Sequence, residues 1–228
     1  AGFSPVLVMS HLACGDQPDH PLNRQQLEHF QTVAAAFPDV ESSCCNSAGI
    51  RLGKDYLFDL TRPGISLYGG STGDSDSRST RPVVTAEARI IDIRQASKGE
   101  TVSYGAAETL ERDSTIAVCS IGYADGYLRS LSGAGVPMRS VHDSGACGFA
   151  KGMRLPVLGC VTMDLTAFDI TDLPTGSLVP GDFIELFGPN INIDDVAAVG
   201  GTIGYEMLTA MGKRYQRFYV NNTREDMS

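Results

Sequence analysis

The sequence predicts an α/β region followed by a mainly-β region, that is, a partial (β/α) barrel remnant and then a C-terminal β-barrel-like domain. Strand-like and helical patterns alternate over the first third of the chain, as in parallel β/α architecture. A small, polar, aperiodic segment at 69–80 has the composition of a linker. Beyond it, apolar residues recur at every second position, as in half-buried strands. We therefore expect three parts, at 1–80, at 81–220 and in a polar tail at 221–228.

The composition excludes several classes of protein. The chain has 228 residues, of which 42% are hydrophobic and 20% charged, as is typical of a globular protein with a substantial core. Its formal net charge of −9 disfavours nucleic acid as a partner. The longest apolar stretches, such as Thr115–Ile121, fall well short of the ~20 residues that a membrane span needs, so no membrane partner is expected.

The six cysteines show neither a C-x-x-C pair nor a histidine at zinc-ligand spacing, so we expect no metal site. Cys44 and Cys45 are adjacent, which is a poor start for a disulfide framework. Free thiols in a reducing cytoplasm are the simplest interpretation, and they predict a cytoplasmic protein. The chain begins at Ala1 and enters a strand-like run within a few residues, so we expect it to be the C-terminal part of something longer.

Each element of the first third follows from a local pattern. Residues 5–9 form an apolar run typical of a strand, and apolar residues then recur at helical spacing over 27–37, before Pro38. A short strand reaches 44–45, and 46–48 has the pattern of a cap and the first turn of another helix. These strands are too few to close a barrel, so the missing strands should lie upstream. Further extended pieces are predicted at 57–60 and 65–68.

The second part has a different period. Between 84 and 90, apolar and polar residues alternate as in a strand with one buried face. The same signature predicts strands at Thr115–Ile121, Leu155–Met163, Leu165–Ile170 and Phe183–Phe187. Helices are predicted at Asp194–Val199 and at Ile203–Met211, the latter with Thr202 as its cap and Gly212 as its end.

Three places could bind a phosphate group. Helix N-termini hold unpaired N–H groups and partial positive charge, so a neighbouring hydroxyl can complete an anion site. Ser47 and Tyr205 are placed in this way, although Ser47 could equally be an ordinary cap and Tyr205 a core or surface residue. In Arg62-Pro63-Gly64, the glycine lets backbone approach a ligand closely, or the tripeptide is a plain turn.

Three further residues could carry chemistry. Tyr123, flanked by glycine after a buried strand, is expected to project from a strand end, or to be an amphipathic loop residue. A tyrosine hydroxyl normally has a pKa of about 10, so a base at neutral pH would need a cationic neighbour. Met163 is a substrate contact or core filler. His11, after a strand, is a structural histidine, a ligand or a ring-stacking partner.

In this order and spacing, the segments resemble the alanine racemase family, which are pyridoxal 5'-phosphate enzymes with an N-terminal α/β barrel and a C-terminal β domain. The resemblance runs from M-S-H-L-A at Met9–Ala13 to Tyr205 and includes N-S-A, R-x-G-I, G-Y-A-D-G and T-M-D, where many relatives have C-M-D. It implies an isomerase that interconverts L-alanine and D-alanine, with a role in D-alanine biosynthesis for peptidoglycan.

The resemblance also implies a role for each candidate. Tyr123 is similar to the catalytic base for the L-enantiomer, and Met163 to the substrate-contacting residue. The implied cofactor residues are His11 against the ring, Arg62 at the pyridine nitrogen, and Ser47, Gly64, Ile65 and Tyr205 at the phosphate. A homodimer with shared active sites is implied, in which the Tyr123 and Met163 positions are donated by the partner.

One part of the family pattern has no match. The cofactor-anchoring lysine, which is also the base for the D-enantiomer, stands in a V-K-A-D-x-Y-G-H-G motif in the family. The lysines of this chain, Lys54, Lys98, Lys151 and Lys213, have no such context. This chain alone is therefore expected to be inactive, as the C-terminal portion of the enzyme.

Other functions stay open at this point. The chain could be a catalytically silent homologue or a dimerisation module that lacks the lysine. It could also belong to another amino acid racemase, acting on serine or on a broad range of substrates. A pyridoxal-phosphate decarboxylase of the same plan is disfavoured, because neither a glycine-rich phosphate loop nor a C-x-x-x-D motif is present.

Overall fold

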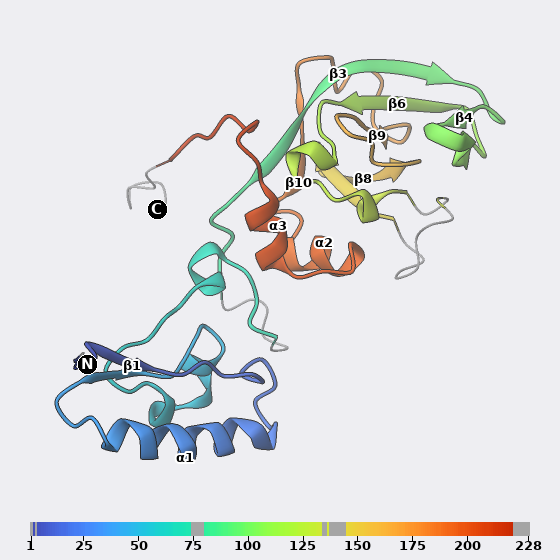
Figure 1. Cartoon of the computed structure of the whole chain (residues 1–228). Helices are drawn as coiled ribbons and strands as arrows, with labels where there is room; N and C mark the ends of the chain where they lie inside the picture. The colour runs from blue at the N-terminus through green and yellow to red at the C-terminus, as the bar shows by residue number, and fades with distance from the viewer. Residues whose placement is uncertain (1, 3, 74–79, 134–135, 137–144, 221–228) are drawn as a thin grey trace. The chain divides into compact units, whose positions relative to one another are not determined.

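The computed structural model describes residues 2, 4–73, 80–133, 136 and 145–220, and Figure 1 shows the chain. The chain divides into two compact units. The first unit comprises Ala1–Ala86 and Phe187–Asp194, and the second comprises Glu87–Leu186 and Asp195–Ser228. Most of the predicted 69–80 linker, at 74–79, and the predicted tail at 221–228 lie outside the described residues.

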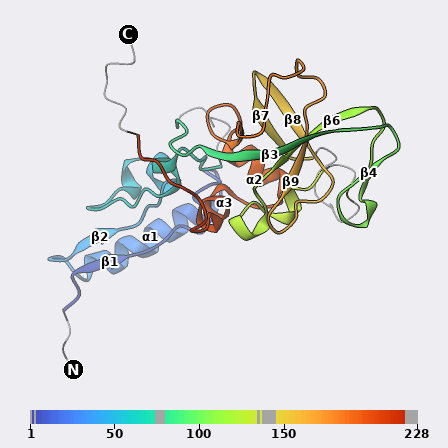
Figure 2. The ribbon, with the colours of Figure 1, turned by 90° about the horizontal axis from the view of Figure 1, so that it is seen from above.

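The first unit contains a β/α/β arrangement. Strands β1 (Leu7–Met9) and β2 (Glu41–Ser43) pair in parallel, with Leu7 opposite Glu41, and helix α1 (Pro21–Ala35) connects them. Figures 1 and 2 show α1 running alongside the strand pair. A parallel pair joined by a helix is the repeating part of an α/β barrel, so the predicted partial barrel is confirmed.

Helix α1 begins six residues before the apolar periodicity does. Pro21 occupies its first turn, where a missing N–H costs nothing, and His20 accepts a hydrogen bond from the Leu22 amide at 3.2 Å through Nδ1. Leu27 and Phe30 are buried, and they pack in one cluster with Leu12, Cys44, Cys45 and Tyr56. Burial of this stripe fixes α1 on the strands.

Two predicted strands of the first unit are wrong. Residues 57–60 form a turn in which Phe58 has a φ of 51°, and their amides at Asp59 and Leu60 donate to the Ser42 carbonyl at 3.1 and 3.2 Å. Residues 65–68 form a 3₁₀ helix, η3 (Ile65–Tyr68), which ends at Gly69 in the left-handed region. Only one residue of η3, Ile65, is buried. A half-buried strand would bury every second residue, so this short apolar run lacks the pattern of a strand.

After β2 the chain forms two short 3₁₀ helices, η1 (Gly49–Leu52) and η2 (Lys54–Tyr56), where the sequence predicts the start of a helix. The Asn46 side chain accepts from the Gly49 amide at 2.9 Å, although the N-cap position of η1 is Ala48. Gly53, with a φ of 119°, separates η1 from η2, and this is why a longer helix does not form.

The second unit is built on a closed six-stranded barrel in the order β10-β3-β6-β9-β8-β7. Figure 1 shows the longest strand, β3, running beside β6, and Figure 2 shows β7, β8 and β9 in the same barrel. The predicted β-barrel-like domain is therefore confirmed. Its strands are β3 (Ala86–Ala96), β6 (Ser114–Cys119), β7 (Cys147–Ala150), β8 (Met153–Leu158), β9 (Thr166–Asp169) and β10 (Phe183–Phe187).

The barrel differs from the prediction at two places. Strand β7 has no predicted counterpart, because its four residues offer too short an alternation. Strand β8 ends at Leu158 instead of Met163, since Gly159 turns the chain with a φ of 64°. Residues 159–165 therefore leave the barrel as a loop, which carries Met163. A small hairpin of β4 (Thr101–Val102) and β5 (Glu108–Thr109) stands outside the barrel.

Helices α2 (Ile193–Val199) and α3 (Gly204–Ala210) lie where helices are predicted. The predicted cap of α3 is wrong, because the N-cap position is Ile203 and no side chain caps it. The Thr202 hydroxyl instead donates to the Glu206 carboxylate. The helix ends one residue early, and the Gly212 amide donates to the Asp125 carbonyl at 3.3 Å. None of the described helices is long and apolar enough to cross a membrane.

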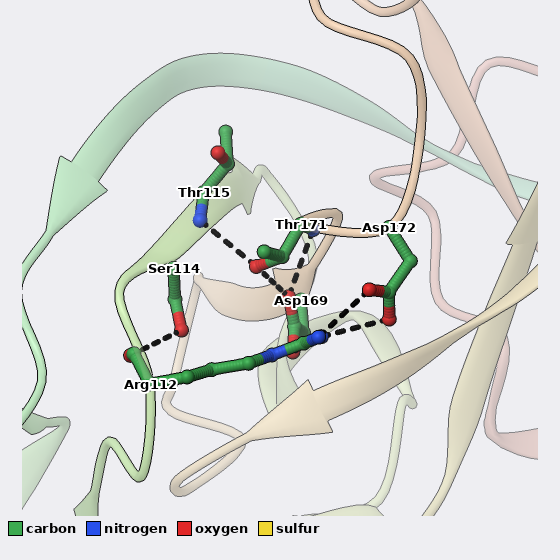
Figure 3. Close-up of polar contacts among 6 residues, drawn as sticks. All are labelled: Arg112, Ser114, Thr115, Asp169, Thr171 and Asp172. Atoms are coloured by element: carbon green, nitrogen blue, oxygen red, sulfur yellow. Dashed lines mark hydrogen bonds and ion pairs between the residues drawn. The ribbon is translucent and has the colours of Figure 1, made fainter.

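A charged cluster joins β6 to the end of β9 (Figure 3). The Arg112 guanidinium contacts both oxygens of Asp172 at 2.7 Å and Asp169 Oδ2 at 3.2 Å. Thr171 donates its amide to Asp169 Oδ1 at 2.9 Å, and its hydroxyl accepts from the Thr115 amide at 2.9 Å. The cluster therefore fastens two neighbouring barrel strands through side chains as well as through the sheet.

We expect Arg112→Met to lower the thermal unfolding temperature modestly at pH 7, and to lower it less as the solution becomes acidic. Hydrogen bonds from Arg112 hold the pKa of Asp172 below its ordinary value of 3.8. Stability from such a lowered pKa is complete above the ordinary value and is lost as the pH falls through the folded value. Melting curves of both proteins between pH 7 and pH 2 test this, and a pH-independent difference would contradict it.

Candidate active site

The Arg62 guanidinium lies across the carboxyl ends of β1 and β2. Its Nη2 donates to the Ser10 carbonyl at 2.6 Å and to the Cys44 carbonyl at 3.4 Å, and its Nη1 donates to the Ser43 hydroxyl. Its amide donates to the Cys45 carbonyl at 3.1 Å. Because ligands of α/β barrels bind at the carboxyl ends of the strands, this half-buried cation stands where a ligand would lie.

Ser47 is a buried hydroxyl that organises the start of η3. Its Oγ accepts from the Gly64 amide at 2.7 Å and from the Ser66 amide at 3.4 Å. The N-cap position of the following helix η1 is Ala48, so Ser47 does not act as that helix's N-cap. A Cβ placed on Gly64 would meet no atom within 4 Å, so the space beside this backbone is open. The adjacent Ile65 is 2% exposed and anchors η3.

We expect Ser47→Ala to lower the free energy of unfolding by about 1–2 kcal/mol, because the Gly64 amide would lose its buried acceptor. Ser66→Ala is the matched control, since it keeps the Ser66 amide and removes only a hydroxyl from the same turn. Urea unfolding of the two variants measures the difference. Equal losses would mean that the Ser47 hydrogen bonds do not hold this turn.

His11 is exposed two residues after β1 ends. Its Nε2 lies 3.3 Å from Asn46 Nδ2, and its backbone carbonyl accepts from Gln26 Nε2 at 3.1 Å. Asn46 thus lies next to the candidate residue His11 in space as well as next to Ser47 in sequence. The first unit brings the predicted residues His11, Ser47, Arg62, Gly64 and Ile65 to the loops that follow β1 and β2.

Tyr123 opens a short turn after β6. The turn is the 3₁₀ helix η5 (Tyr123–Asp125), whose amides at Tyr123 and Ala124 donate to the Thr162 and Met163 carbonyls at 2.9 and 3.0 Å. Two segments about 40 residues apart in sequence are thus joined directly. The Tyr123 and Met163 side chains are 43% and 54% exposed, so the structure presents the two predicted residues together at the barrel surface.

Two glycines allow this close packing. A Cβ on Gly122 would stand 2.3 Å from the Thr162 carbonyl oxygen and 2.4 Å from that of Met163. Gly126 has a φ of 93°, and a Cβ there would stand 2.1 Å from the Ala210 carbonyl oxygen. The Tyr123 turn therefore rests between the Met163 loop and the end of α3, and only glycine fits at either contact.

Tyr123 and two neighbouring tyrosines, Tyr127 and Tyr215, have different surroundings. Tyr127 is 1% exposed, burial raises its pKa, and its hydroxyl has no hydrogen-bond partner among the described residues. Burial, with a smaller effect of Asp125, also raises the pKa of Tyr215 to about 12. Tyr127 is enclosed by the protein, whereas Tyr123 is 43% exposed, so Tyr123 is the one of these two that can reach a ligand.

Charged groups hold the same turn. Asp125 is buried and accepts from the Gly122 amide at 2.9 Å, and its other oxygen pairs with Arg214 Nε at 3.0 Å. Arg214 Nη1 contacts Asp164, the residue after Met163, at 2.7 Å. The sequence argument missed this network, because Arg214 lies in a segment without a motif.

Tyr205 lies in the first turn of α3 and is 44% exposed. Its carbonyl accepts from the Thr209 hydroxyl at 2.9 Å, which is an ordinary helix contact. Tyr205 belongs to the second unit, whereas Ser47, Gly64 and Ile65 belong to the first. Its place in a phosphate site with them stays a prediction. The described residues include no cluster of side chains that could hold a metal ion.

These features define a class of protein in which a parallel α/β unit, with a basic and hydroxyl-lined strand edge, precedes an antiparallel barrel that presents a tyrosine. Residues 1–72 match the family model of the alanine racemase N-terminal domain, and residues 83–219 match that of the alanine racemase C-terminal domain. The chain belongs to the alanine racemase family.

Individual relatives agree with this assignment. The chain is 58% identical over 220 residues to a biosynthetic alanine racemase of Agrobacterium fabrum, covering 96% of this chain and 56% of the relative. An alanine racemase of Rhizobium meliloti is also 58% identical, with 96% of this chain and 58% of the relative covered. The chain spans about half the length of these curated relatives.

Solved structures show the same fold. An alanine racemase from Bartonella henselae with covalently bound pyridoxal phosphate is 38% identical, with a TM-score of 0.82 over 94% of this chain and 56% of that chain. An alanine racemase from Bacillus anthracis with bound L-Ala-P is 26% identical, with a TM-score of 0.78 over 94% of this chain and 55% of that chain.

Proposed function

We propose that this chain is the C-terminal part of a pyridoxal 5'-phosphate-dependent alanine racemase, an isomerase that interconverts L-alanine and D-alanine with one base on each face of the substrate. Tyr123 is the base for the L-enantiomer, and Met163 contacts the substrate. The observation that carries the proposal is the direct joining of the Tyr123 turn to the Met163 loop by two backbone hydrogen bonds. These bonds join the backbones of two segments that each carry an exposed residue of the proposed site, Tyr123 and Met163.

The first unit fits one end of the cofactor. Ser47, Gly64 and Ile65 form a hydroxyl-and-amide turn with open space beside Gly64, as a phosphate requires. The family resemblance assigns Tyr205 to the same phosphate group. His11 lies against the ring. When bound, pyridoxal phosphate withdraws electrons from the substrate and so makes its α-proton easier to remove. The remaining chemistry is the work of the side chains.

Arg62 would face the pyridine nitrogen of the bound cofactor and offer it only a hydrogen-bond donor. Its guanidinium has N–H donors and no acceptor, and three protein acceptors hold it in place. The ring nitrogen of a bound cofactor would therefore stay largely unprotonated. A weaker electron sink suits removal and return of one proton and disfavours transamination.

Racemisation needs a second base on the opposite face, and this chain does not carry the family's lysine motif. The lysine and the rest of the barrel would come from an upstream segment. We further propose a homodimer in which Tyr123 and Met163 serve the partner's cofactor, and a cytoplasmic role in supplying D-alanine for peptidoglycan. A family member without its lysine is catalytically silent, so a silent homologue or dimerisation module is the second candidate.

The test uses a completed protein, defined as this chain joined to the upstream, lysine-bearing part of the Agrobacterium fabrum relative. We expect the completed protein to convert L-alanine to D-alanine, measured by chiral chromatography, and to convert serine more slowly. The 228-residue chain alone should do neither. With pyridoxal phosphate, it should show no aldimine absorbance band that tritiated borohydride fixes stoichiometrically on a single lysine. A completed protein that binds the cofactor without racemising alanine would favour the silent homologue.

A further inference from the structure

We propose that Arg214 is a positioning residue: it locks the Tyr123 turn onto the Met163 loop and so sets where the Tyr123 hydroxyl lies. The catalytic part of this inference rests on the proposed function. The structural part rests on contacts within the second unit alone, and it can fail or hold independently.

The first contact of Arg214 is with the turn itself. Asp125 ends η5, and its side chain is 9% exposed, so water cannot easily compensate its charge. One carboxylate oxygen accepts from the Gly122 amide at 2.9 Å, at the residue before Tyr123. The other oxygen pairs with Arg214 Nε at 3.0 Å. Asp125 therefore holds the turn that contains Tyr123 through a hydrogen bond to Gly122 and an ion pair with Arg214.

The second contact is with the substrate loop. Arg214 Nη1 lies 2.7 Å from Asp164 Oδ1, directly after Met163. One guanidinium thus spans the two segments that already share the hydrogen bonds from Tyr123 and Ala124. Without Arg214, the turn and the loop would still share those two backbone bonds, and the Thr166 hydroxyl would still donate to the Ile121 carbonyl at 2.8 Å beside them.

Arg214 is itself held in place. The Gly212 amide donates to the Asp125 carbonyl at 3.3 Å, which fixes the start of the segment against the turn. Arg217 Nη2 donates to the Met211 and Gly212 carbonyls at 3.2 and 3.0 Å, which fixes the backbone that leads to Arg214. Because the backbone of Arg214 is anchored, its guanidinium can fix where the two aspartates lie. On a free tail it would only neutralise their charge.

The chain supplies a matched control. Arg112 is 50% exposed and Arg214 is 53% exposed, and each bridges two aspartates of the second unit. The Arg112 cluster in Figure 3 includes none of the proposed site residues. Arg112→Met and Arg214→Met therefore remove the same charge from comparable networks, and they differ in which segments are released.

The structural readout is hydrogen exchange of the Tyr123 and Ala124 amides in the completed protein, without substrate. Arg214→Met should speed exchange of these amides by about tenfold or more, while Arg112→Met should leave their rates unchanged. The catalytic readout is incorporation of α-deuterium from solvent into L-alanine and, separately, into D-alanine. Arg214→Met should slow incorporation into L-alanine by about 10- to 100-fold and affect D-alanine much less, since a small displacement of a catalytic group has effects of this order.

Arg214→Lys and Asp164→Asn extend the test to milder changes. Lysine keeps the charge but cannot bridge both aspartates as a fork, so it should restore part of the L-alanine exchange. Asp164→Asn should reproduce part of the loss while leaving the Asp125 pair intact. If Arg214→Met does not fold, these two variants carry the test by themselves.

The outcomes separate the two proposals. If the unaltered completed protein does not racemise alanine, the proposed function fails, and amide exchange still decides the positioning role. If it racemises alanine, but the Arg214 variants match Arg112→Met in amide exchange and in both deuterium rates, the positioning role is wrong. Equal slowing for both enantiomers would also overturn it, because that result indicates general destabilisation.

Discussion

Tyr123→Phe in the completed protein is expected to slow α-deuterium incorporation into L-alanine by about 10²–10⁴-fold, the usual contribution of a positioned general base. The change removes one hydroxyl and keeps the ring, and the 43% exposed side chain tolerates it without repacking. Incorporation into D-alanine should survive better, because the lysine on the other face still acts. Net racemisation must slow equally in both directions, so the asymmetry is visible only in isotope exchange.

Tyr127→Phe is the control for this experiment. Tyr127 stands four residues away in the same motif, but it is 1% exposed and its hydroxyl has no described partner. Its removal should leave both exchange rates within about twofold and should not lower stability, because no hydrogen bond is lost. Equal loss for both enantiomers in Tyr123→Phe would assign Tyr123 to orientation of cofactor or substrate. Normal exchange from L-alanine would remove it from the mechanism.

Gly122→Ala should have the second large effect, a loss of about 3 kcal/mol in the free energy of unfolding together with loss of racemase activity. The new methyl group would stand 2.3 and 2.4 Å from two backbone carbonyl oxygens, and neither can move aside as a side chain could. The turn and the Met163 loop must separate, which breaks the hydrogen bonds of Tyr123 and Ala124. Urea unfolding and chiral chromatography measure the two effects.

Gly212→Ala is the matched control, because Gly212 also lies beside this turn. A Cβ there would meet only the Ala124 carbonyl oxygen at 3.8 Å, which is ordinary van der Waals contact. This variant should be within about 0.5 kcal/mol of the unaltered protein, as is usual for a substitution without a clash. If Gly122→Ala is equally well tolerated, the close crossing of the two segments is not maintained in solution.

The parts of the fold that the sequence predicts well are those with a long, regular period. Strand β3 alternates clearly over its first half, and the stripe of α1 recurs every three to four residues. Short apolar runs carry no such signal. Residues 65–68 could pair as a strand or turn as a 3₁₀ helix, and the flanking Gly64 and Gly69 decide for the turn through backbone freedom.

The candidate site likewise contains residues that the sequence predicts and contacts that it does not. Ser47, Arg62 and Tyr123 lie in short motifs whose chemistry is readable locally, and the first unit does bring Ser47 to the Gly64 amide. The network of Asp125, Asp164 and Arg214 could not be predicted, because its ion pairs join residues 50 or more positions apart, as with Asp164 and Arg214. Long-range pairs leave no periodicity in a single sequence.

The buried cysteines make it possible to follow the unfolding of each unit by chemical labelling. Cys44 and Cys45 lie in the core of the first unit, and Cys119 lies in the barrel of the second. Burial raises the pKa of all three, that of Cys119 to about 12, so alkylating reagents find neither access nor thiolate in the native state. Each unit thus contains its own chemical reporter, and mass spectrometry of the labelled peptides would time the opening of one unit separately from the other.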